Sequence, residues 1–463
     1  MAHAPLGVPT VTTTHPSMGD IGSITPHTAR ATAHPNIALV KYWGKRNADL
    51  VLPATGSLSL TLDIYPTDTV VNPDPSLTSD IFTLNGEPAP GTPTHRVSAF
   101  LDLVRKRSAE QNSGQQNSEL AHTYARVNSI NSVPTGAGLA SSASGFAALA
   151  TAASKAYGLP GDPRSLSRLA RRGSGSATRS ILGNLVIWHP GDGDDDHADL
   201  TSYAESVPGP DLTMVICVVS GAQKAVSSRV AMADTIRTSP FFDGWVSSTQ
   251  RDLVDMQQAL AEGDYTRVGE ITESNALRMH AAINGNRPPV RYLAPTSVAI
   301  FDAIAQLRND GLEVYGTADA GPNVVALCQS KDLDATHAAL HERFPDLELI
   351  PARAGAGARL TPIAETSQMS RPMEMERTPH RLPTNRTVRS NSRDTDLRPR
   401  LGTRKAVHRR RIRCCSPRAC RVTHRCRQVC ARHAHAHRHR NRNATIRHER
   451  PHQTRRSPGP VGS

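Results

Sequence analysis

A glycine- and serine-rich stretch, NSVPTGAGLASSASG at residues 131–145, contains the residue types that bind phosphate. Gly136 and Gly138 lack a Cβ, so the backbone can approach a ligand closely and point amide N–H groups at it. Ser141 and Ser142 add hydroxyl groups for a phosphate or a metal ion, and a helix beginning here would add unsatisfied N–H groups. The stretch predicts a polyphosphate site. The alternative is a serine-capped helix whose small residues allow close packing.

Three basic residues, Lys41, Lys45 and Arg179, are candidates for binding further negative charge. The planar guanidinium of arginine suits a carboxylate, whereas lysine is a mobile point charge suited to phosphate oxygens. The alternative is that they are solvated surface charges, as most lysines and arginines are. The small residues at 174–176 favour a binding role for Arg179.

Asp319 is the candidate carboxylate for catalysis. It lies in ADAGP, where glycine and proline follow a predicted strand and form a rigid turn. Transfer of a phosphoryl group to an alcohol requires a carboxylate within hydrogen-bond reach of the hydroxyl, to orient it or to accept its proton. The alternative is an aspartate that only caps its own turn.

Hydrophobic periodicity predicts the elements that position the glycine-rich stretch. Residues 127–133 are expected to form a strand that enters it, and apolar residues recur at helical spacing from 146 to 157, before Gly158. A second helix is expected from Pro163 to the GSGS at 173–176. Strand, glycine-rich turn and helix is the order that an anion site requires.

The remaining pattern predicts an α+β fold. Residues 57–71 alternate apolar and polar side chains and indicate one half-buried antiparallel strand, and Asn85-Gly86 indicates a hairpin before a helix around residue 100. The run at 212–220 predicts a buried strand. Helices are expected at 254–260, 268–279 and 298–307, strands on both sides of Asp319, and a last helix and strand that end near Arg359.

Two domains are expected, at residues 30–210 and 211–360. Residues 1–29 are expected to be a flexible leader or the product of a start codon assigned too early, and residues 361–463 a disordered tail. The tail has 26 Lys and Arg against 6 Asp and Glu and no aromatic residue, whereas the rest of the chain is mildly acidic. Such a composition cannot bury enough apolar surface to offset the entropy of ordering.

Three interpretations of the tail remain open. Arginine could bind nucleic acid or an acidic membrane. Zinc could bind the tail's five cysteines and its histidines, although their spacing matches no common zinc finger. Translation of GC-rich DNA in the wrong frame or past a stop codon would give the same composition, and this interpretation is favoured.

The two cysteines outside the tail, Cys217 and Cys328, lie in hydrophobic runs and predict buried thiols of a reduced, cytoplasmic protein. No apolar run approaches the ~20 residues needed to span a bilayer, and the N-terminus lacks the apolar core of a secretory signal. Neither a membrane nor a nucleic-acid partner is expected for the folded body.

The stretch PTGAGLASSA, from Pro134 to Ala143, resembles the phosphate loop of the GHMP kinase superfamily. Within that superfamily, NIALVKYWGKR (36–46), RRGSGSATRSILG (171–183) and TADAGPNV (317–324) resemble the diphosphomevalonate decarboxylase family, and the resemblance covers about residues 31–359. VVSGAQKAVSSR (218–229) departs from the family pattern, which puts a ligand contact by that stretch in doubt.

The resemblance implies a two-domain GHMP kinase fold and a homodimer that converts mevalonate 5-diphosphate to isopentenyl diphosphate, with ATP and Mg²⁺. It assigns Asp319 to orient the 3-hydroxyl during phosphoryl transfer, and Arg179 and Lys41 to act on the carboxylate and the leaving group. Substrate-binding residues would be Asn36, Tyr42, Lys45, Ser174 and Ser176, beside Arg179. ATP would be bound by Pro134, Gly136, Gly138, Leu139, Ser141 and Ser142, with Ser142 also at the catalytic centre and at the metal ion.

Two other functions are compatible with the sequence. A related GHMP kinase would phosphorylate mevalonate or phosphomevalonate without decarboxylation, and only the acceptor site would differ. A nucleic-acid-binding protein would act through its basic tail.

Overall fold

The computed structural model describes residues 21–111, 119–132, 141–220 and 225–363. All of these belong to one compact unit, residues 1–372, and the proposed domain boundary at residue 210 stays a prediction. The tail from residue 364 and most of the leader lie outside the described residues. No helix of the described part is both long and apolar enough to cross a membrane.

Each expected helix is present in the described part of the chain, and most are longer than predicted. The helix from Pro163 ends at Gly173 as predicted, since Asp162 caps the Ser165 N–H and proline occupies the first turn. The described helices are α1 (Thr92–Gln111), α2 (Ser141–Ala156), α3 (Pro163–Gly173), α4 (Ala177–Ser180), α5 (Asp196–Thr201), α6 (Ser228–Thr238), α7 (Phe242–Glu262), α8 (Tyr265–Asn284), α9 (Pro295–Asn309) and α10 (Leu333–Arg343), with short 3₁₀ turns at Leu120–His122 and Ser330–Asp332.

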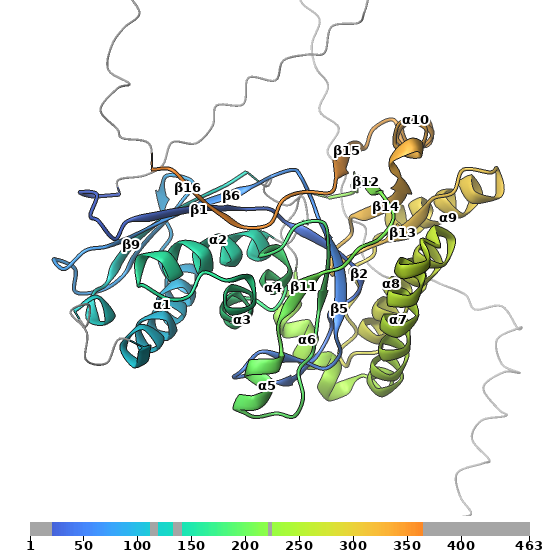
Figure 1. Ribbon diagram of the computed structural model, residues 1–463. Coiled ribbons are helices and arrows are strands. Elements are labelled where there is room, and N and C mark those ends of the chain that lie inside the picture. The colour runs from blue at the N-terminus through green and yellow to red at the C-terminus, as the bar shows by residue number, and fades with distance from the viewer. Residues whose placement is uncertain (1–20, 112–118, 133–140, 221–224, 364–463) are drawn as a thin grey trace, which may run out of the picture. The chain divides into compact units, whose positions relative to one another are not determined.

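A six-stranded sheet is covered on one face by α1, α2 and α3 (Figure 1). The Asn85-Gly86 hairpin is confirmed between its last two strands, with both residues at positive φ. The strand order is β16-β1-β6-β9-β7-β8, with β1 at Ala29–Ala33, β6 at Thr67–Pro73, β7 at Ile81–Leu84, β8 at Glu87–Pro88, β9 at Ala125–Asn131 and β16 at Arg359–Thr361.

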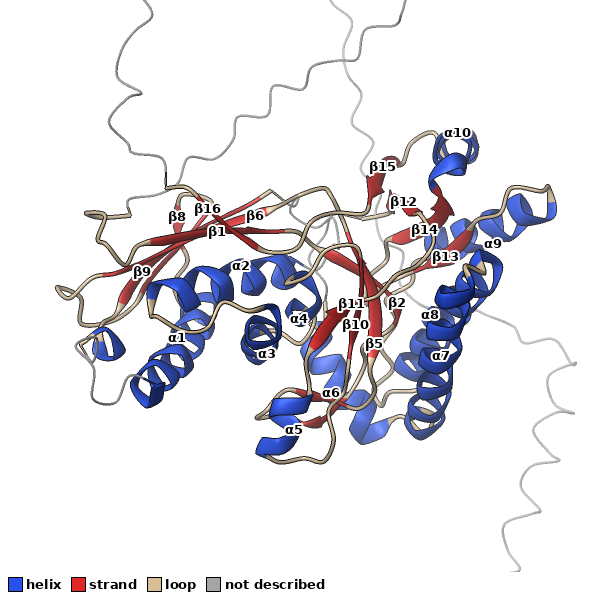
Figure 2. Ribbon diagram, in the orientation of Figure 1, coloured by secondary structure: helices blue, strands red, loops and turns tan. Residues whose placement is uncertain are grey.

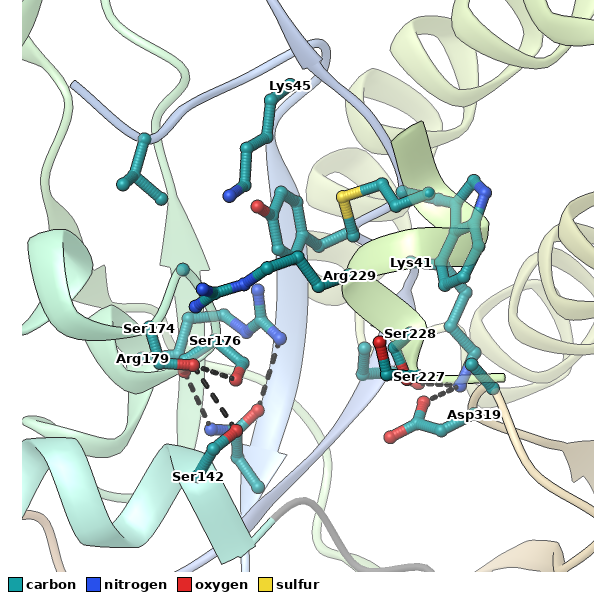
Figure 3. A pocket seen from close by; sticks show the side chains of 18 of the residues that line it. Lys41, Lys45, Ser142, Ser174, Ser176, Arg179, Ser227, Ser228, Arg229 and Asp319 are labelled. Atoms are coloured by element: carbon teal, nitrogen blue, oxygen red, sulfur yellow. Dashed lines mark hydrogen bonds and ion pairs between the residues drawn. The ribbon is translucent and has the colours of Figure 1, made fainter. Parts of the chain in front are cut away.

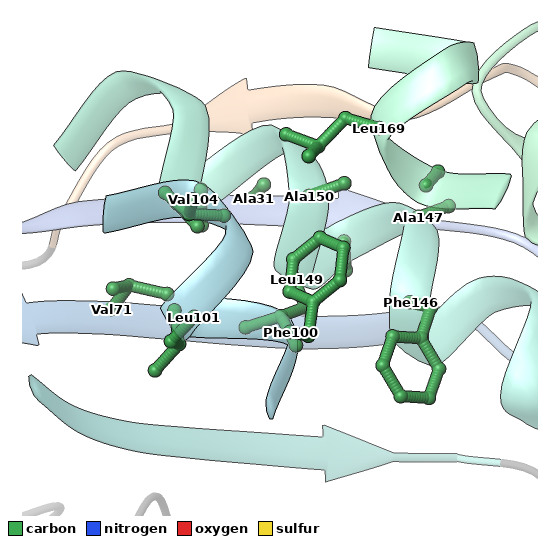
Figure 4. Close-up of a cluster of buried hydrophobic side chains, with 14 of the residues drawn as sticks. Ala31, Val71, Phe100, Leu101, Val104, Phe146, Ala147, Leu149, Ala150 and Leu169 are labelled. Atoms are coloured by element: carbon green, nitrogen blue, oxygen red, sulfur yellow. The ribbon is translucent and has the colours of Figure 1, made fainter. Parts of the chain in front are cut away.

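The core under this sheet is built around α2 (Figure 4). Buried alanines along α2 allow its backbone to lie close to the strands, and larger side chains such as Phe100, Leu101 and Phe146 fill the space toward α1. The Phe100 and Phe146 rings meet edge to face, with centroids 5.7 Å apart. This packing fixes the N-terminus of α2, where Ser141 and Ser142 lie.

Two further four-stranded sheets share a second core with α7 and α8 (Figure 2). One has the order β11-β10-β5-β2 and the other β13-β14-β12-β15, and a two-stranded ribbon pairs β3 with β4. Their bounds are β2 Asn36–Val40, β3 Lys45–Asn47, β4 Leu52–Pro53, β5 Ser57–Thr61, β10 Leu185–Trp188, β11 Ala204–Ser206, β12 Leu212–Val218, β13 Tyr315–Thr317, β14 Val324–Gln329 and β15 Glu348–Arg353.

The prediction of a single half-buried strand at 57–71 is wrong. The segment forms β5 and β6, which belong to different sheets. Tyr65 adopts a positive φ of 51° immediately before Pro66, and this turn redirects the chain. All five residues of β5 are buried, because this strand lies between two others and is covered by packed elements.

The predicted buried thiols are confirmed, since Cys217 and Cys328 are both buried and free. The buried strand expected at 212–220 is also confirmed as β12, which pairs with β14 on one side and β15 on the other. Several short elements were not predicted, and neither were α6 and β16. The strand β16 pairs with β1 and extends past the expected end of the domain to Thr361.

Candidate active site

A cavity of about 360 Å³ brings together residues far apart in the sequence (Figure 3). Its walls include β2 and the residues that follow it, the N-terminus of α2, the segment between α3 and α4, α4 itself, the start of α6 and the turn after β13. Single residues of α1, β3 and α8 also line it. Nine of the predicted site residues line it. These are Asn36, Lys41, Tyr42, Lys45, Ser142, Ser174, Ser176, Arg179 and Asp319.

Lys41 and Asp319 form an ion pair on one side of the cavity. The Lys41 Nζ donates to Asp319 Oδ1 at 2.7 Å and to the Ala38 carbonyl at 2.9 Å. The lysine side chain is 1% exposed and the aspartate 29%, so only the carboxylate is open to a ligand. Burial lowers the pKa of Lys41, and the charge of Asp319 opposes this effect.

Arg179 lies on the other side of the cavity, at the end of α4, and is also buried. Its guanidinium donates to Ser57 Oγ and, at 3.2 Å, to Asn36 Oδ1. The Asn36 amide in turn donates to the Ser180 hydroxyl at 2.8 Å, which holds its oxygen toward the arginine. Burial lowers the pKa of Arg179 to about 10, so the guanidinium stays charged at neutral pH.

Three serine hydroxyls form a row beside Arg179 (Figure 3). Ser142 Oγ lies 3.3 Å from Ser174 Oγ, which lies 3.4 Å from Ser176 Oγ. The row joins the first turn of α2 to the segment before α4. Hydroxyl groups in such a row can donate to several oxygens of one phosphate.

Tyr42 and Lys45 also line the cavity. The Tyr42 hydroxyl is buried without a hydrogen-bond partner in the described part of the chain, and burial raises its pKa, so it is a neutral donor. Burial lowers the pKa of Lys45, and the charges of Arg229 and Arg96 add to this effect. An anion placed among these groups would relieve the repulsion.

A smaller cavity of about 170 Å³ adjoins the N-terminus of α2 and is lined by both Ser141 and Ser142. Its other walls are largely apolar and include Phe82, Leu84 and Phe146. The four remaining predicted nucleotide-binding residues, Pro134, Gly136, Gly138 and Leu139, lie outside the described residues.

Five polar residues that line the larger cavity were not predicted from the sequence: Arg96, Arg172, Ser227, Ser228 and Arg229. The last three belong to the stretch for which a ligand contact was in doubt, and the start of α6 brings them to the cavity. The Ser-Ser-Arg triplet is the signal that could have found them. Of the charged residues that line this cavity in the described part, six are cationic and one, Asp319, is acidic.

A magnesium ion fits this cavity only together with a nucleotide. Within the described ranges, no three His, Cys, Asp or Glu side chains are grouped so that they could hold a metal ion. Magnesium in phosphoryl-transfer sites commonly binds one or two carboxylates together with substrate phosphates and water. Among the described walls of this cavity, the Asp319 carboxylate is the one carboxylate, and the Ser142 hydroxyl is one of several hydroxyl oxygens that could serve as a ligand.

Models of two protein families match the chain. The diphosphomevalonate decarboxylase-like N-terminal domain matches residues 33–203, and the mevalonate 5-diphosphate decarboxylase C-terminal domain matches residues 214–389. The second match extends 29 residues beyond the expected end of the folded body at 360.

Curated relatives carry the same family name. A diphosphomevalonate decarboxylase of Gibberella zeae is 37% identical over 68% of this chain and 84% of its own length. The diphosphomevalonate decarboxylase of Homo sapiens is 33% identical over 75% of this chain and 88% of its own length.

Solved structures show the same fold. A mevalonate diphosphate decarboxylase from Enterococcus faecalis is 42% identical with a TM-score of 0.65, and the match covers 72% of this chain and 98% of that one. A structure described as “MDDEF in complex with MVAPP, AMPPCP and Magnesium” is 43% identical with a TM-score of 0.66 over the same shares of the two chains. The expected GHMP kinase fold is therefore confirmed, and the chain belongs to the diphosphomevalonate decarboxylase family.

Proposed function

We propose that this protein catalyses the ATP-dependent decarboxylation of mevalonate 5-diphosphate to isopentenyl diphosphate, with release of ADP, phosphate and CO₂. The observation that carries the proposal is the charge of the larger cavity, where six cations among the described lining residues surround one carboxylate that is paired with a buried lysine. A substrate with a diphosphate and a carboxylate matches this charge pattern. A solved relative is described in complex with MVAPP, AMPPCP and magnesium.

The substrate's two anionic ends would bind different groups. The diphosphate suits the mobile charge of Lys45, the Tyr42 hydroxyl and the Arg229 guanidinium, which together leave positive charge uncompensated. The carboxylate suits Arg179, whose planar guanidinium is held in place by Asn36. Ser174 and Ser176 provide hydroxyl groups between these two regions.

ATP would bind beside the N-terminus of α2. The apolar cavity at Phe82, Leu84 and Phe146 suits an aromatic base, and it shares Ser142 of the first turn with the larger cavity. Ser141 and Ser142, with the backbone N–H groups of that turn, would hold the phosphates. Magnesium, when bound with the nucleotide, would neutralise charge on the transferred group, with Ser142 as its protein ligand.

Asp319 would orient the substrate's 3-hydroxyl toward the γ-phosphoryl group and accept its proton as the O–P bond forms. Lys41 holds the carboxylate in place through a 2.7 Å ion pair. The new phosphate then leaves with the electrons of its C–O bond. The bond between the carboxylate carbon and its neighbour breaks at the same time, its electrons form the alkene, and CO₂ is released. Arg179 and Lys41 would stabilise the charges that move in this step.

The test supplies the full chain with ATP, Mg²⁺ and mevalonate 5-diphosphate and follows ADP and CO₂ in one sample. Equal release of both supports the proposal. Release of ADP without CO₂ would indicate a kinase of the same superfamily, and release of neither would overturn both functions. The homodimer that the resemblance implies and the cytoplasmic location that the two cysteines predict both stay predictions.

A further inference from the structure

The backbone of Lys41 lies at the edge of a sheet. It directly follows β2, which is the outermost strand of the order β11-β10-β5-β2. The pairing of β2 with β5 is irregular between Ala38 and Val40, and it ends with Val40 opposite Leu58. The Lys41 backbone is therefore not fixed by strand pairing. Its side chain nevertheless forms the ion pair with Asp319, so its position requires another contact.

Asn275, from the middle of α8, provides the missing contact. Its Oδ1 accepts a hydrogen bond from the Lys41 backbone N–H at 2.8 Å, and the asparagine is completely buried. A buried backbone N–H without an acceptor would cost about 1–3 kcal/mol. This contact therefore fixes the point at which the chain leaves β2.

Asp252, on the neighbouring helix α7, determines which way the Asn275 amide points. Asn275 Nδ2 donates to Asp252 Oδ2 at 2.7 Å and to Thr249 Oγ1 at 3.3 Å. A flipped amide would place its NH₂ against the Lys41 N–H and its oxygen against a carboxylate, so one orientation satisfies all partners. Arg278 donates to both oxygens of Asp252, at 2.8 and 2.6 Å, and balances its buried charge.

We propose that Asn275, oriented by Asp252, is a positioning residue that fixes Lys41 against Asp319 for phosphoryl transfer. The hydrogen bonds run from α7 through α8 to the Lys41 backbone, and the Lys41 side chain continues them to the carboxylate. This inference rests on the proposed function. Displacement of a reacting group by about 1 Å can cost a hundredfold in rate, so a structural contact at this place is expected to act on kcat.

The test changes Asn275 alone and then exchanges the amide of Asn275 with the carboxylate of Asp252. Asn275→Ala removes the acceptor, and Asn275→Asp places a second carboxylate against Asp252. The double variant Asn275→Asp/Asp252→Asn restores the hydrogen bonds of position 275, because the amide introduced at position 252 can donate to the carboxylate introduced at position 275. The oxygen of that amide still accepts one of the two hydrogen bonds from Arg278. Thr272→Val is the matched control, since Thr272 is buried on α8 and its hydroxyl has no hydrogen-bond partner in the described part.

Both single variants should lower kcat at least tenfold while the KM values for ATP and mevalonate 5-diphosphate change less than about threefold. The double variant should recover kcat to within about threefold of the wild type, and Thr272→Val should match the wild type. A double variant no more active than Asn275→Asp would overturn the proposal, as would wild-type kcat in Asn275→Ala. If Asn275→Asp does not fold, the folded double variant alone decides between these outcomes.

Hydrogen exchange at the Lys41 amide gives a readout independent of turnover. Exchange should be at least tenfold faster in Asn275→Ala than in the wild type and slow again in the double variant. If the wild type releases neither ADP nor CO₂, the proposed function fails, while the exchange rates still test whether Asn275 holds Lys41. Equal exchange in the wild type and Asn275→Ala would overturn the positioning role whatever the activity.

Discussion

Asp319 is the one acidic side chain among the described residues that line the larger cavity. Asp319→Asn should lower kcat by roughly 10²- to 10⁴-fold, because an amide can orient the hydroxyl but cannot accept its proton. The KM values should change little, since the proposed contacts of the substrate's anionic ends are with other groups. Steady-state release of ADP and CO₂ measures the effect.

The same substitution leaves Lys41 buried without its counter-ion, so a loss of about 1–3 kcal/mol in the free energy of unfolding is expected. Asp302→Asn is the control, because Asp302 is an exposed acid on α9 and should change neither quantity. Decarboxylation near the wild-type rate by a folded Asp319→Asn variant would remove this aspartate from the mechanism.

His280 on α8 is a buried group beside the Lys41–Asp319 pair that titrates in an accessible pH range. Burial, and then the charge of Lys41, lower its pKa to about 4, although Asp319 acts in the opposite direction. Because the pKa is lower in the folded state than the usual 6.5, the unfolded chain binds the proton first as the pH falls. Stability is therefore fully present above about pH 6.5 and is lost progressively toward about pH 4.

From about pH 7 to about pH 5 this one histidine should remove about 2 kcal/mol from the free energy of unfolding. The measurement compares urea unfolding of the wild type and of His280→Gln at both pH values, since the chain has 20 histidines and only the difference isolates one. The wild type should lose about 2 kcal/mol more than the variant over this interval. Equal losses would show that His280 titrates normally.

The segment between α3 and α4 is tightly fitted to the cavity. A Cβ built on Gly175 would lie 2.8 Å from the Tyr42 ring, whereas one on Gly161 would meet no atom within 4 Å. Gly175→Ala should therefore displace Tyr42 and raise the KM for mevalonate 5-diphosphate at least roughly fivefold, with about 1–3 kcal/mol of destabilisation. Steady-state kinetics and thermal unfolding measure both, and Gly161→Ala should behave as the wild type.

Elements whose information is local could be predicted from the sequence. The helix from Pro163 to Gly173 has a cap at Asp162, proline in the first turn and a glycine at its end. Asn85-Gly86 has the backbone preference of a hairpin turn. The nine predicted residues that line the cavity all lie in four short motifs, and most of these motifs hold more than one predicted site residue.

Tertiary arrangement could not be predicted in the same way. The alternation at 57–71 continues through Pro66, so periodicity gave no sign that β5 and β6 enter different sheets. Arg229 reaches the cavity because α6 begins beside it, and Asn275 contacts Lys41 across 234 residues of sequence. Such contacts depend on how helices pack, which a single sequence does not encode in any local pattern.

Over residues 1–360, the net charge of the chain and the charge of the larger cavity have opposite signs. Residues 1–360 contain more Asp and Glu than Lys and Arg, yet the described walls of the larger cavity gather six cations around one carboxylate. The field that attracts a polyanionic substrate is therefore local to the cavity. Every described residue that lines this cavity precedes residue 321, and the last described strand ends at Thr361.

Removal of residues 390–463 should therefore leave kcat and both KM values within about twofold of the full chain. The cut preserves the compact unit to residue 372 and the family match to residue 389. If the full chain binds nucleic acid, its affinity should decrease steeply with salt concentration. The truncated chain, which lacks most of the tail's arginines, should bind more weakly. Turnover retained together with lost nucleic-acid binding would assign the decarboxylase activity to the body, whereas turnover lost on truncation would make the tail part of the enzyme and contradict the mistranslated-tail hypothesis.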